Sequence, residues 1–348
     1  MTARPDIVLI SLGTTRGLRI ADEAFAAMLR KAGASVTVAG VRIGATGRLR
    51  RFYPATDLVE IVAAARAART ALERYDPRAV VAATTGVAML APLGDRPYAV
   101  RFDSPAALNR PGRRNAIQHA LERRRMRSAR LLLPLSHAAE RAVPAGSARS
   151  VVVPMPIAPS GPDGPRERVA VAYTPDPKAK GLDVLGAAWG LAAVPDARLL
   201  VFGIDPGRGR AFLARFGIPE PAGLEWRGSV PRDEFRAALR QAHVHVTSAR
   251  WEDWGQAQLE ALADGTLLAA TPAGGPFEAL TFARALDPRL VASEVSVHAL
   301  AAVIRAAFEL SEEERARYAR AASPYLEPFR EDVIQDVVEH EVLPALLG

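Results

Sequence analysis

The chain has 348 residues, of which 49% are hydrophobic and 24% charged, a composition typical of folded proteins rather than disordered ones. It contains no cysteine, which excludes disulfides, a thiolate nucleophile and cysteine-based metal sites, and no apolar run reaches the roughly 18 residues of a membrane-spanning helix. The length exceeds the usual size of one hydrophobic core, so two domains are expected. The N-terminus lacks the layout of a signal peptide, and we expect a cytoplasmic protein.

Charge is distributed unevenly along the chain. The net charge is +7, but residues 1–160 carry +14 and residues 161–348 carry −7. A basic half indicates an anionic surface or substrate on that half alone, such as nucleic acid, an anionic membrane or a lipid-phosphate acceptor. A solvated arginine-rich surface is the alternative.

The first half alternates apolar strand patterns with helical patterns, which is typical of a parallel sheet covered by helices on both faces. Strands are predicted at residues 6–12, 34–39, 79–83, 98–102 and 131–135. Helices are predicted at about 20–32, 57–74 and 114–130.

Residues 154–165 (PMPIAPSGPDGP) contain five prolines and two glycines, which predicts a linker. The alternation then restarts. Further strands are predicted at 168–173, 197–202, 223–226, 244–247 and 267–270, and helices at 181–191, 209–216, 231–242, 256–263, 296–309 and 312–322. We therefore predict an α/β protein of two Rossmann-like domains whose parallel sheets face an interdomain cleft, because such sheets bind ligands at the carboxyl ends of their strands.

Lysine is rare in this chain, and its positions are informative. Of the 45 basic residues only Lys31, Lys178 and Lys180 are lysine, and two of these share one tripeptide. A lysine ammonium is a compact point charge suited to phosphate at close range. Lys178 and Lys180 are therefore candidate phosphate ligands.

Two glutamates mark the segment from Ser248 to Glu278. Glu252 follows a predicted strand, and Glu260 lies eight residues later in a helix that begins after Gly255. Gln256 and Glu260 are four residues apart and share a helix face. The first-turn N–H groups of this helix, at Gly255–Gln258, and its positive dipole end suit a phosphate.

This pattern resembles the retaining glycosyltransferases of family four, which have the GT-B fold and a Glu-x7-Glu signature. Other stretches match the same family. They are Glu122-Arg123 and Ser136 in the first half, Val151–Pro154 before the linker, Trp226-Arg227-Gly228, and Gly274, Gly275 and Glu278 after the second glutamate.

The resemblance implies a role for each matching residue. Glu260 would bind the ribose of a nucleotide-sugar donor, Glu252 would lie beside the donor sugar, and Lys180 would bind the diphosphate. Gly255, Gln256 and Arg227 join the donor-binding set. The implied domains are an acceptor-side unit at 1–155, completed by about 325–348, and a donor unit at 165–322. The implied reaction retains the anomeric configuration and needs no metal.

The chain departs from the family pattern at two sites. Tyr173 and Thr174 stand where the family has Gly-Arg, so the arginine that binds the diphosphate is missing, and Lys178 is our candidate to replace it. Phe102 and Asp103 stand where the family has His-Asp, which leaves Asp103 as the catalytic candidate in the first half.

The first half holds two further candidates. Gly13 opens the loop after the first strand, where a glycine loop of this fold approaches the diphosphate and acceptor; a plain turn is the alternative. Arginines cluster on and before the helix at 114–130. They lack interleaved aromatics, so we expect no nucleic acid, and an interfacial membrane contact, a phosphate-bearing acceptor and a solvated face remain open. These arginines are Arg110, Arg113, Arg114, Arg123, Arg124, Arg125, Arg127 and Arg130.

The six histidines show no metal-ligand spacing with carboxylates, and we expect no metal and no cofactor. The sequence thus predicts a glycosyltransferase that uses a nucleotide-sugar donor, located in the cytoplasm or peripherally at the inner membrane. A catalytically silent nucleotide-sugar-binding protein and a nucleotide-sugar epimerase of the same fold are the alternatives. The donor base, the sugar and the acceptor (a sugar, a lipid-linked group or a small molecule) stay open.

Overall fold

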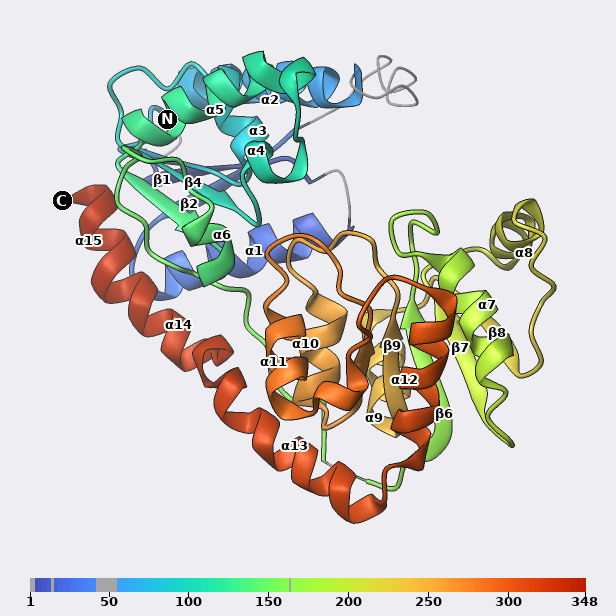
Figure 1. Cartoon of the computed structure of the whole chain (residues 1–348). Helices are drawn as coiled ribbons and strands as arrows, with labels where there is room; N and C mark the ends of the chain where they lie inside the picture. Colours follow the sequence, from blue (N-terminus) through green and yellow to red (C-terminus); the bar gives the residue numbers. More distant parts are fainter. Residues whose placement is uncertain (1–3, 14–15, 42–54, 163) are drawn as a thin grey trace. The chain divides into compact units, whose positions relative to one another are not determined.

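The computed structural model describes residues 4–13, 16–41, 55–162 and 164–348, with Arg16 and residues 55–57 described by their backbone alone. The chain divides into two compact units (Figure 1). Unit 1 comprises Met1–Pro156 and Glu331–Gly348, and unit 2 comprises Ile157–Arg330. The division at Pro156 falls inside the proline-rich segment.

Unit 1 is built on a parallel sheet with the strand order β2-β1-β3-β4-β5. Every residue of β1, β3, β4 and β5 is buried, whereas β2, at one edge of the sheet, is partly exposed. The buried strands are accordingly rich in apolar residues. The strands are β1 (Ile7–Ser11), β2 (Val36–Gly40), β3 (Ala79–Ala82), β4 (Tyr98–Phe102) and β5 (Leu131–Pro134).

Helices cover both faces of this sheet. On one face α1 (Arg16–Lys31) packs together with the C-terminal segment, whose Ile334, Val338 and Leu346 join the core around β1. That segment consists of α14 (Glu331–Val337), the π-helix η5 (Val338–Val342) and α15 (Leu343–Leu347). On the other face lie α2 (Ala55–Tyr75), α3 (Thr85–Leu90) and α5 (Ala116–Ser128). The short elements are α4 (Ala106–Asn109), η2 (Arg113–Asn115) and α6 (His137–Arg141).

Unit 2 repeats the plan with a second parallel sheet, in the order β10-β9-β6-β7-β8. Its strands are β6 (Glu167–Tyr173), β7 (Arg198–Phe202), β8 (Leu224–Gly228), β9 (Ala242–Thr247) and β10 (Leu267–Ala270). One face packs against α9 (Arg232–Gln241) and α10 (Gln256–Ala263). On the other face α7 (Leu182–Ala192) packs against α12 (Val297–Glu309), with Trp189 against Phe308.

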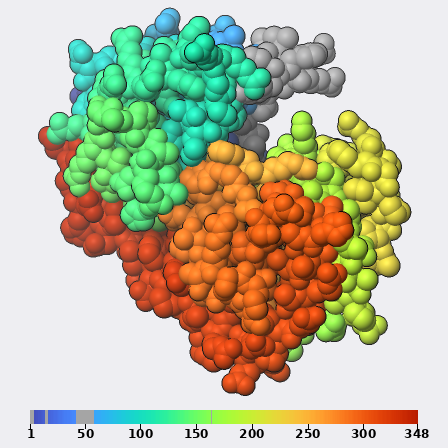
Figure 2. Space-filling view, viewed as in Figure 1, coloured from blue at the N-terminus to red at the C-terminus, as the bar shows by residue number. Residues whose placement is uncertain are grey.

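The remaining helices of unit 2 complete its outer layer. The space-filling view shows the side chains of α11 and α12, in orange tones, as a continuous surface on this unit (Figure 2). The α13 helix packs on α10 and α11 and begins with a capping box formed by Ser311 and Glu314. These elements are α8 (Pro206–Arg215), α11 (Glu278–Leu286), η3 (Pro288–Leu290), α13 (Glu312–Leu326) and η4 (Glu327–Phe329).

The two parallel α/β sheets predicted from the sequence are confirmed, and the ten predicted strands all occur. Several short helices escaped the sequence analysis, among them α3, α6 and α11. The first two begin at Thr84 and Ser136, whose side-chain oxygens accept the N–H groups of Val87 and Ala139. Helices of five or six residues show too little periodicity to stand out in a sequence.

Candidate active site

The loops after β6 and β9 are joined at the carboxyl edge of the unit 2 sheet. The hydroxyl of Ser248 donates to the carbonyl oxygens of Lys180 and Gly181, at 2.9 Å each. Gly181 has φ 64°, and a Cβ at this position would lie 2.1 Å from the carbonyl oxygen of Ser248. Only glycine fits so close an approach with this backbone conformation. The contact holds the lysine-containing loop against the segment that leads to Glu252.

Arg250 adds a second connection between the same two loops. Its backbone N–H donates to the Ala179 carbonyl at 2.9 Å, and its guanidinium donates to the Lys178 carbonyl at 2.8 Å. The guanidinium also makes a bidentate pair with Asp183, with N–O distances of 2.9 and 2.6 Å. Burial alone would raise the pKa of Asp183, but the bonds from Arg250 outweigh it and hold that pKa below its usual value.

These connections bring the ammonium group of Lys180 into contact with the carboxylate of Glu252. The Lys180 ammonium lies 2.6 Å from Glu252 Oε2, and the Gln258 amide donates to the same oxygen at 3.2 Å. The two side chains of the ion pair are 21% and 11% exposed. The backbone N–H of Glu252 donates to the Gly274 carbonyl at 2.9 Å, which brings the glycine pair of the sequence pattern to the same place.

Glu260 lies deeper, between α10 and α9. It is 3% exposed, and its Oε1 accepts from Gln256 at 2.9 Å and from the Arg232 Nε at 3.1 Å. Glu260 is therefore a buried, paired carboxylate and not a solvated residue of the helix surface. Arg236, one turn after Arg232, lies 3.8 Å from Glu260 and 2.8 Å from Asp264.

The arginines of α9 are site residues that the sequence analysis missed. Arg232 and Arg236 on α9 are four residues apart, as are Glu260 on α10 and Asp264 at the C-cap of α10. The two helices therefore present opposite charges at the same spacing. The four-residue spacing of the arginines and of the carboxylates was the only sign of this pairing in the sequence. It carries no information on which helices are neighbours, so it could not be used before the sheet order was known.

Gly255 and Gln256 begin α10. Gly255 has φ 76°, and a Cβ there would lie 2.5 Å from the Phe277 ring, so glycine is required at this N-cap. The side-chain amide of Gln256 donates a hydrogen bond to Glu260, four residues later, which agrees with the prediction that the two residues share a helix face.

The other candidates of unit 2 have different surroundings. Lys178 is exposed, and its loop is shaped by Asp176, whose carboxylate accepts the N–H of Lys178 at 3.0 Å. Thr174 is 2% exposed, with its hydroxyl toward the Phe202 carbonyl, so its side chain is directed inward. Arg227 forms ion pairs at 3.9 and 3.8 Å with two exposed carboxylates of its own edge, those of Glu225 and Glu234.

In unit 1, Asp103 lies at the carboxyl end of β4. Its Oδ1 accepts the Ser104 N–H at 2.8 Å. It lines a cavity of about 140 Å³ together with Arg110 and with Thr84 and Thr85 at the start of α3. This is the edge of the sheet at which ligands of Rossmann-like domains bind.

Gly13 follows β1 at the same sheet edge. It has φ 54°, and its carbonyl accepts from Arg19 at 2.8 Å. Residues 14–15 of this loop lie outside the described residues. Nearby, Ser11 donates to the buried Asp22 at 2.5 Å, and Asp22 lies 3.8 Å from the buried Arg101. Burial raises the pKa of Asp22 and lowers that of Arg101.

The arginines around α5 divide into two groups. Arg125 donates to the carbonyls of Met89 and Ala91, at 3.1 and 2.6 Å, and Arg130 to that of Ala345 at 3.0 Å, so these two anchor neighbouring segments. Arg123, Arg124 and Arg127 are exposed around a surface hollow of about 490 Å³. Some arginines of the cluster predicted from the sequence therefore hold neighbouring segments together, while others face solvent.

Metal and membrane features can be assessed for the described residues. They contain no group of three or more His, Asp or Glu side chains placed to hold a metal ion. His245 is buried, and burial lowers its pKa to about 4. In the described part of the chain, no helix combines the length and the apolar character needed to cross a membrane.

Known proteins resemble this chain in the sequence of unit 2 and in the fold. Residues 164–323, nearly all of unit 2, match the protein family described as "Glycosyl transferases group 1". No curated protein sequence matches the chain significantly. Several hundred solved chains, however, share its fold.

Three of these structures illustrate the match. Sucrose-phosphate synthase of Thermosynechococcus elongatus is 16% identical, with a TM-score of 0.72 over 94% of this chain and 96% of that one. HepE of Anabaena, solved in complex with UDP-glucose, is 14% identical, with a TM-score of 0.73 over 98% and 100%. The fold is that of the GT-B glycosyltransferases.

A third GT-B structure has a comparable likeness. The UDP-forming α,α-trehalose-phosphate synthase of Burkholderia xenovorans, in complex with glucose-6-phosphate, is 13% identical, with a TM-score of 0.71 over 98% and 99%. Identities this low establish the fold alone. The family match is confined to residues 164–323, in unit 2.

Proposed function

We propose that this GT-B protein is a retaining glycosyltransferase whose donor binds at the carboxyl edge of the unit 2 sheet. The observation that carries the proposal is the contact between Lys180 and Glu252, 2.6 Å apart, next to the first turn of α10. A cation, a carboxylate and free helix N–H groups are the features needed to hold a diphosphate beside a sugar.

Each residue has a distinct task in this proposal. The Lys180 ammonium and the first-turn N–H groups of α10 stabilise the departing diphosphate. The Oε1 atom of Glu252 accepts a hydroxyl of the donor sugar and faces the positive charge that develops at the anomeric carbon. Glu260 orients the nucleotide through the ribose hydroxyls, with Arg232 and Gln256 holding its carboxylate in place.

The missing family arginine needs a substitute, because the single positive charge of one lysine does not balance the negative charge of two phosphates. Thr174 supplies no charge and is buried. Lys178 is exposed on the same loop, and its backbone is fixed by Asp176 and Arg250. We assign the second phosphate contact to Lys178. Arg227 completes the donor set at the end of β8.

Unit 1 would bind the acceptor. Asp103 and Gly13 stand at the carboxyl ends of β4 and β1, the edge of the unit 1 sheet at which a ligand of this unit would bind. The exposed arginines of α5 favour an anionic partner on this unit, either a phosphate-bearing acceptor or a peripheral membrane surface. We expect vesicle attachment, if it occurs, to weaken as salt is added, because exposed charges are screened over about 8–10 Å near physiological salt.

A binding screen followed by product analysis tests the proposal. Thermal shifts are measured first with UDP-glucose, the ligand in the HepE structure, and then with GDP-, ADP- and dTDP-sugars. NMR of the product made from the stabilising donor gives the anomeric configuration. Binding without hydrolysis or transfer would instead support the catalytically silent protein, and no binding of any donor would refute both.

Two variants test the division of labour. Glu260→Ala should weaken donor binding, because the ribose contact exists in the ground and transition states alike. Glu252→Ala should mainly lower kcat, because its contact strengthens as charge develops. If both variants kept the donor affinity and rate of the wild type, these assignments would be wrong.

A further inference from the structure

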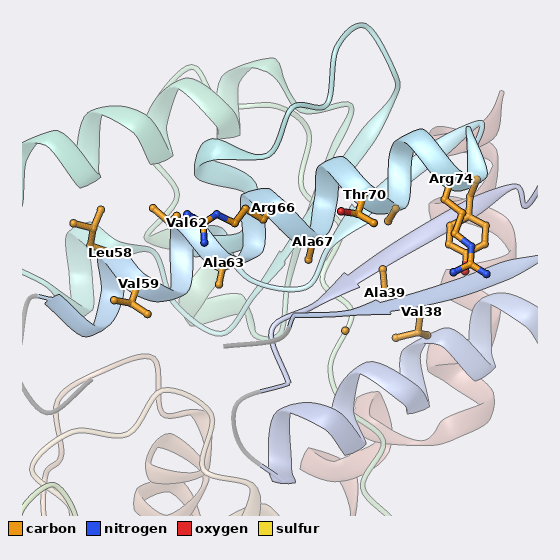
Figure 3. Close-up of a pocket in the computed structure, with 13 residues that line it drawn as sticks. Val38, Ala39, Leu58, Val59, Val62, Ala63, Arg66, Ala67, Thr70 and Arg74 are labelled. Atoms are coloured by element: carbon orange, nitrogen blue, oxygen red, sulfur yellow. The ribbon is translucent and has the colours of Figure 1, made fainter. Parts of the chain in front are cut away.

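A long groove runs along unit 1 between edge strand β2 and helix α2 (Figure 3). Its volume is about 870 Å³, within the range of about 300–1,000 Å³ typical of small-molecule sites. The lining residues of α2 extend from Leu58 to Tyr75, which is about 25 Å at 1.5 Å per residue. The groove therefore suits an elongated ligand.

Short side chains explain why the groove is hollow. The helix contributes Ala63, Ala67 and Ala71, and the strand contributes Ala39 and Gly40. In the close-up, Ala63 and Ala67 of α2 point toward the side on which Val38 and Ala39 lie (Figure 3). Most of the lining residues are apolar, and the polar groups among them are the side chains of Arg66, Thr70 and Arg74 and the hydroxyl of Tyr75.

The charge of the lining has one sign. No Asp or Glu is found among the residues that line the groove, whereas Arg66 and Arg74 are both exposed there. Within the described residues, neither guanidinium has an acidic partner at ion-pair distance; Arg74 lies over the Tyr75 ring, 5.1 Å from its centre. The two arginines are eight residues apart, about 12 Å along the helix. An apolar channel with cations at intervals complements a hydrocarbon chain that carries an anionic group.

We propose that this groove binds a lipid, with its apolar chain along α2 and its anionic headgroup against Arg66 or Arg74. A peptide added to the edge of β2 would use backbone hydrogen bonds and would not account for the cations. The site belongs to unit 1 alone. It is independent of the donor site proposed in unit 2, so a failure of one leaves the other standing.

Lysophosphatidate tests the proposal, titrated into the full chain by calorimetry below the concentration at which it forms micelles. Ala67→Trp fills the groove and should weaken binding about tenfold or more, a change of about 1.4 kcal/mol. Ala65→Trp is the matched control, because Ala65 lies on the same helix but does not line the groove. It should bind like the wild type. If Ala67→Trp fails to fold, Ala63→Leu tests the same space.

Charge reversal tests the headgroup. Arg66→Glu combined with Arg74→Glu should weaken lysophosphatidate binding, while Arg69→Glu, on α2 outside the lining, should leave it unchanged. An uncharged monoacylglycerol should bind more weakly than lysophosphatidate to the wild type.

Three results would overturn the proposal. They are no lysophosphatidate binding by the wild type, equal weakening by the two tryptophan variants, and binding of glycerol phosphate as tight as that of lysophosphatidate. The last result would identify a free-phosphate site instead. Donor binding, measured in the same preparations, should not change in any of these variants.

Discussion

Lys180→Met is the most informative perturbation of the donor site. It removes the ammonium group and keeps most of the apolar stem, so the loop joined by Gly181 and Ser248 is retained. In the wild type the ammonium lies 2.6 Å from Glu252 Oε2 and is 21% exposed as a side chain, which leaves it accessible to a ligand.

The expected loss combines two effects. A charge-assisted hydrogen bond to phosphate contributes about 1.5–3 kcal/mol, so the affinity for a nucleoside diphosphate should fall about ten- to a hundredfold. The variant also leaves Glu252, whose side chain is 11% exposed, with only the Gln258 amide among its described side-chain donors. The unneutralised carboxylate then repels the diphosphate and lowers the affinity further.

A double variant separates the two effects. Lys180→Met combined with Glu252→Gln removes the repulsion, so it should recover part of the lost diphosphate affinity. Calorimetry with the nucleoside diphosphate, the monophosphate and the bare nucleoside measures each contribution, and affinity for the nucleoside should hardly change. Lys178→Ala is the comparison on the same loop. Its loss should lie nearer tenfold than a hundredfold, because solvent screens an exposed ammonium.

The reasoning fails if Lys180→Met binds the diphosphate as tightly as the wild type. It also fails if the nucleoside is weakened as much as the diphosphate, because the lysine would then act on the fold rather than on the phosphates. Unchanged diphosphate affinity in Lys178→Ala would refute the replacement of the missing arginine by Lys178 and nothing else.

Three other predictions concern the fold and the metal. Gly181→Ala places a Cβ 2.1 Å from the Ser248 carbonyl oxygen at φ 64°, so it should lower the free energy of unfolding by about 2–5 kcal/mol, measured by denaturant titration. Gly164→Ala is the control: no atom lies within 4 Å of a Cβ at this position, so the free energy of unfolding should stay close to that of the wild type. The pKa of His245 is about 4 in the folded chain against an ordinary 6.5, so the unfolded state binds more protons between these pH values, and the free energy of unfolding should fall by up to about 3 kcal/mol as the pH drops through this window. His245→Asn should lose this pH dependence. An unchanged dependence of the free energy of unfolding on pH in the variant would contradict the prediction. Sugar transfer should persist in excess EDTA, and a requirement for Mg²⁺ or Mn²⁺ restored by add-back would show the metal-free mechanism to be wrong.

The sequence by itself determined the strands, the longer helices and the two-sheet plan, because these follow from local periodicity and from proline and glycine punctuation. It also singled out Lys180, Glu252 and Glu260, since lysine is scarce in the chain and the two glutamates have a recognisable spacing. Their grouping could be expected because the carboxyl ends of parallel strands meet at one edge.

Only the tertiary structure decided how these groups are held. The pair of Arg250 with Asp183 and the contact of Arg232 with Glu260 join residues 67 and 28 positions apart. They exist because β9 pairs with β6 and because α9 and α10 share one face of the sheet. The inward position of Thr174 and the anchoring of Arg125 on the carbonyls of Met89 and Ala91 have the same origin. Such contacts depend on which strands and helices are neighbours in space, and residue periodicity along the chain carries no record of that.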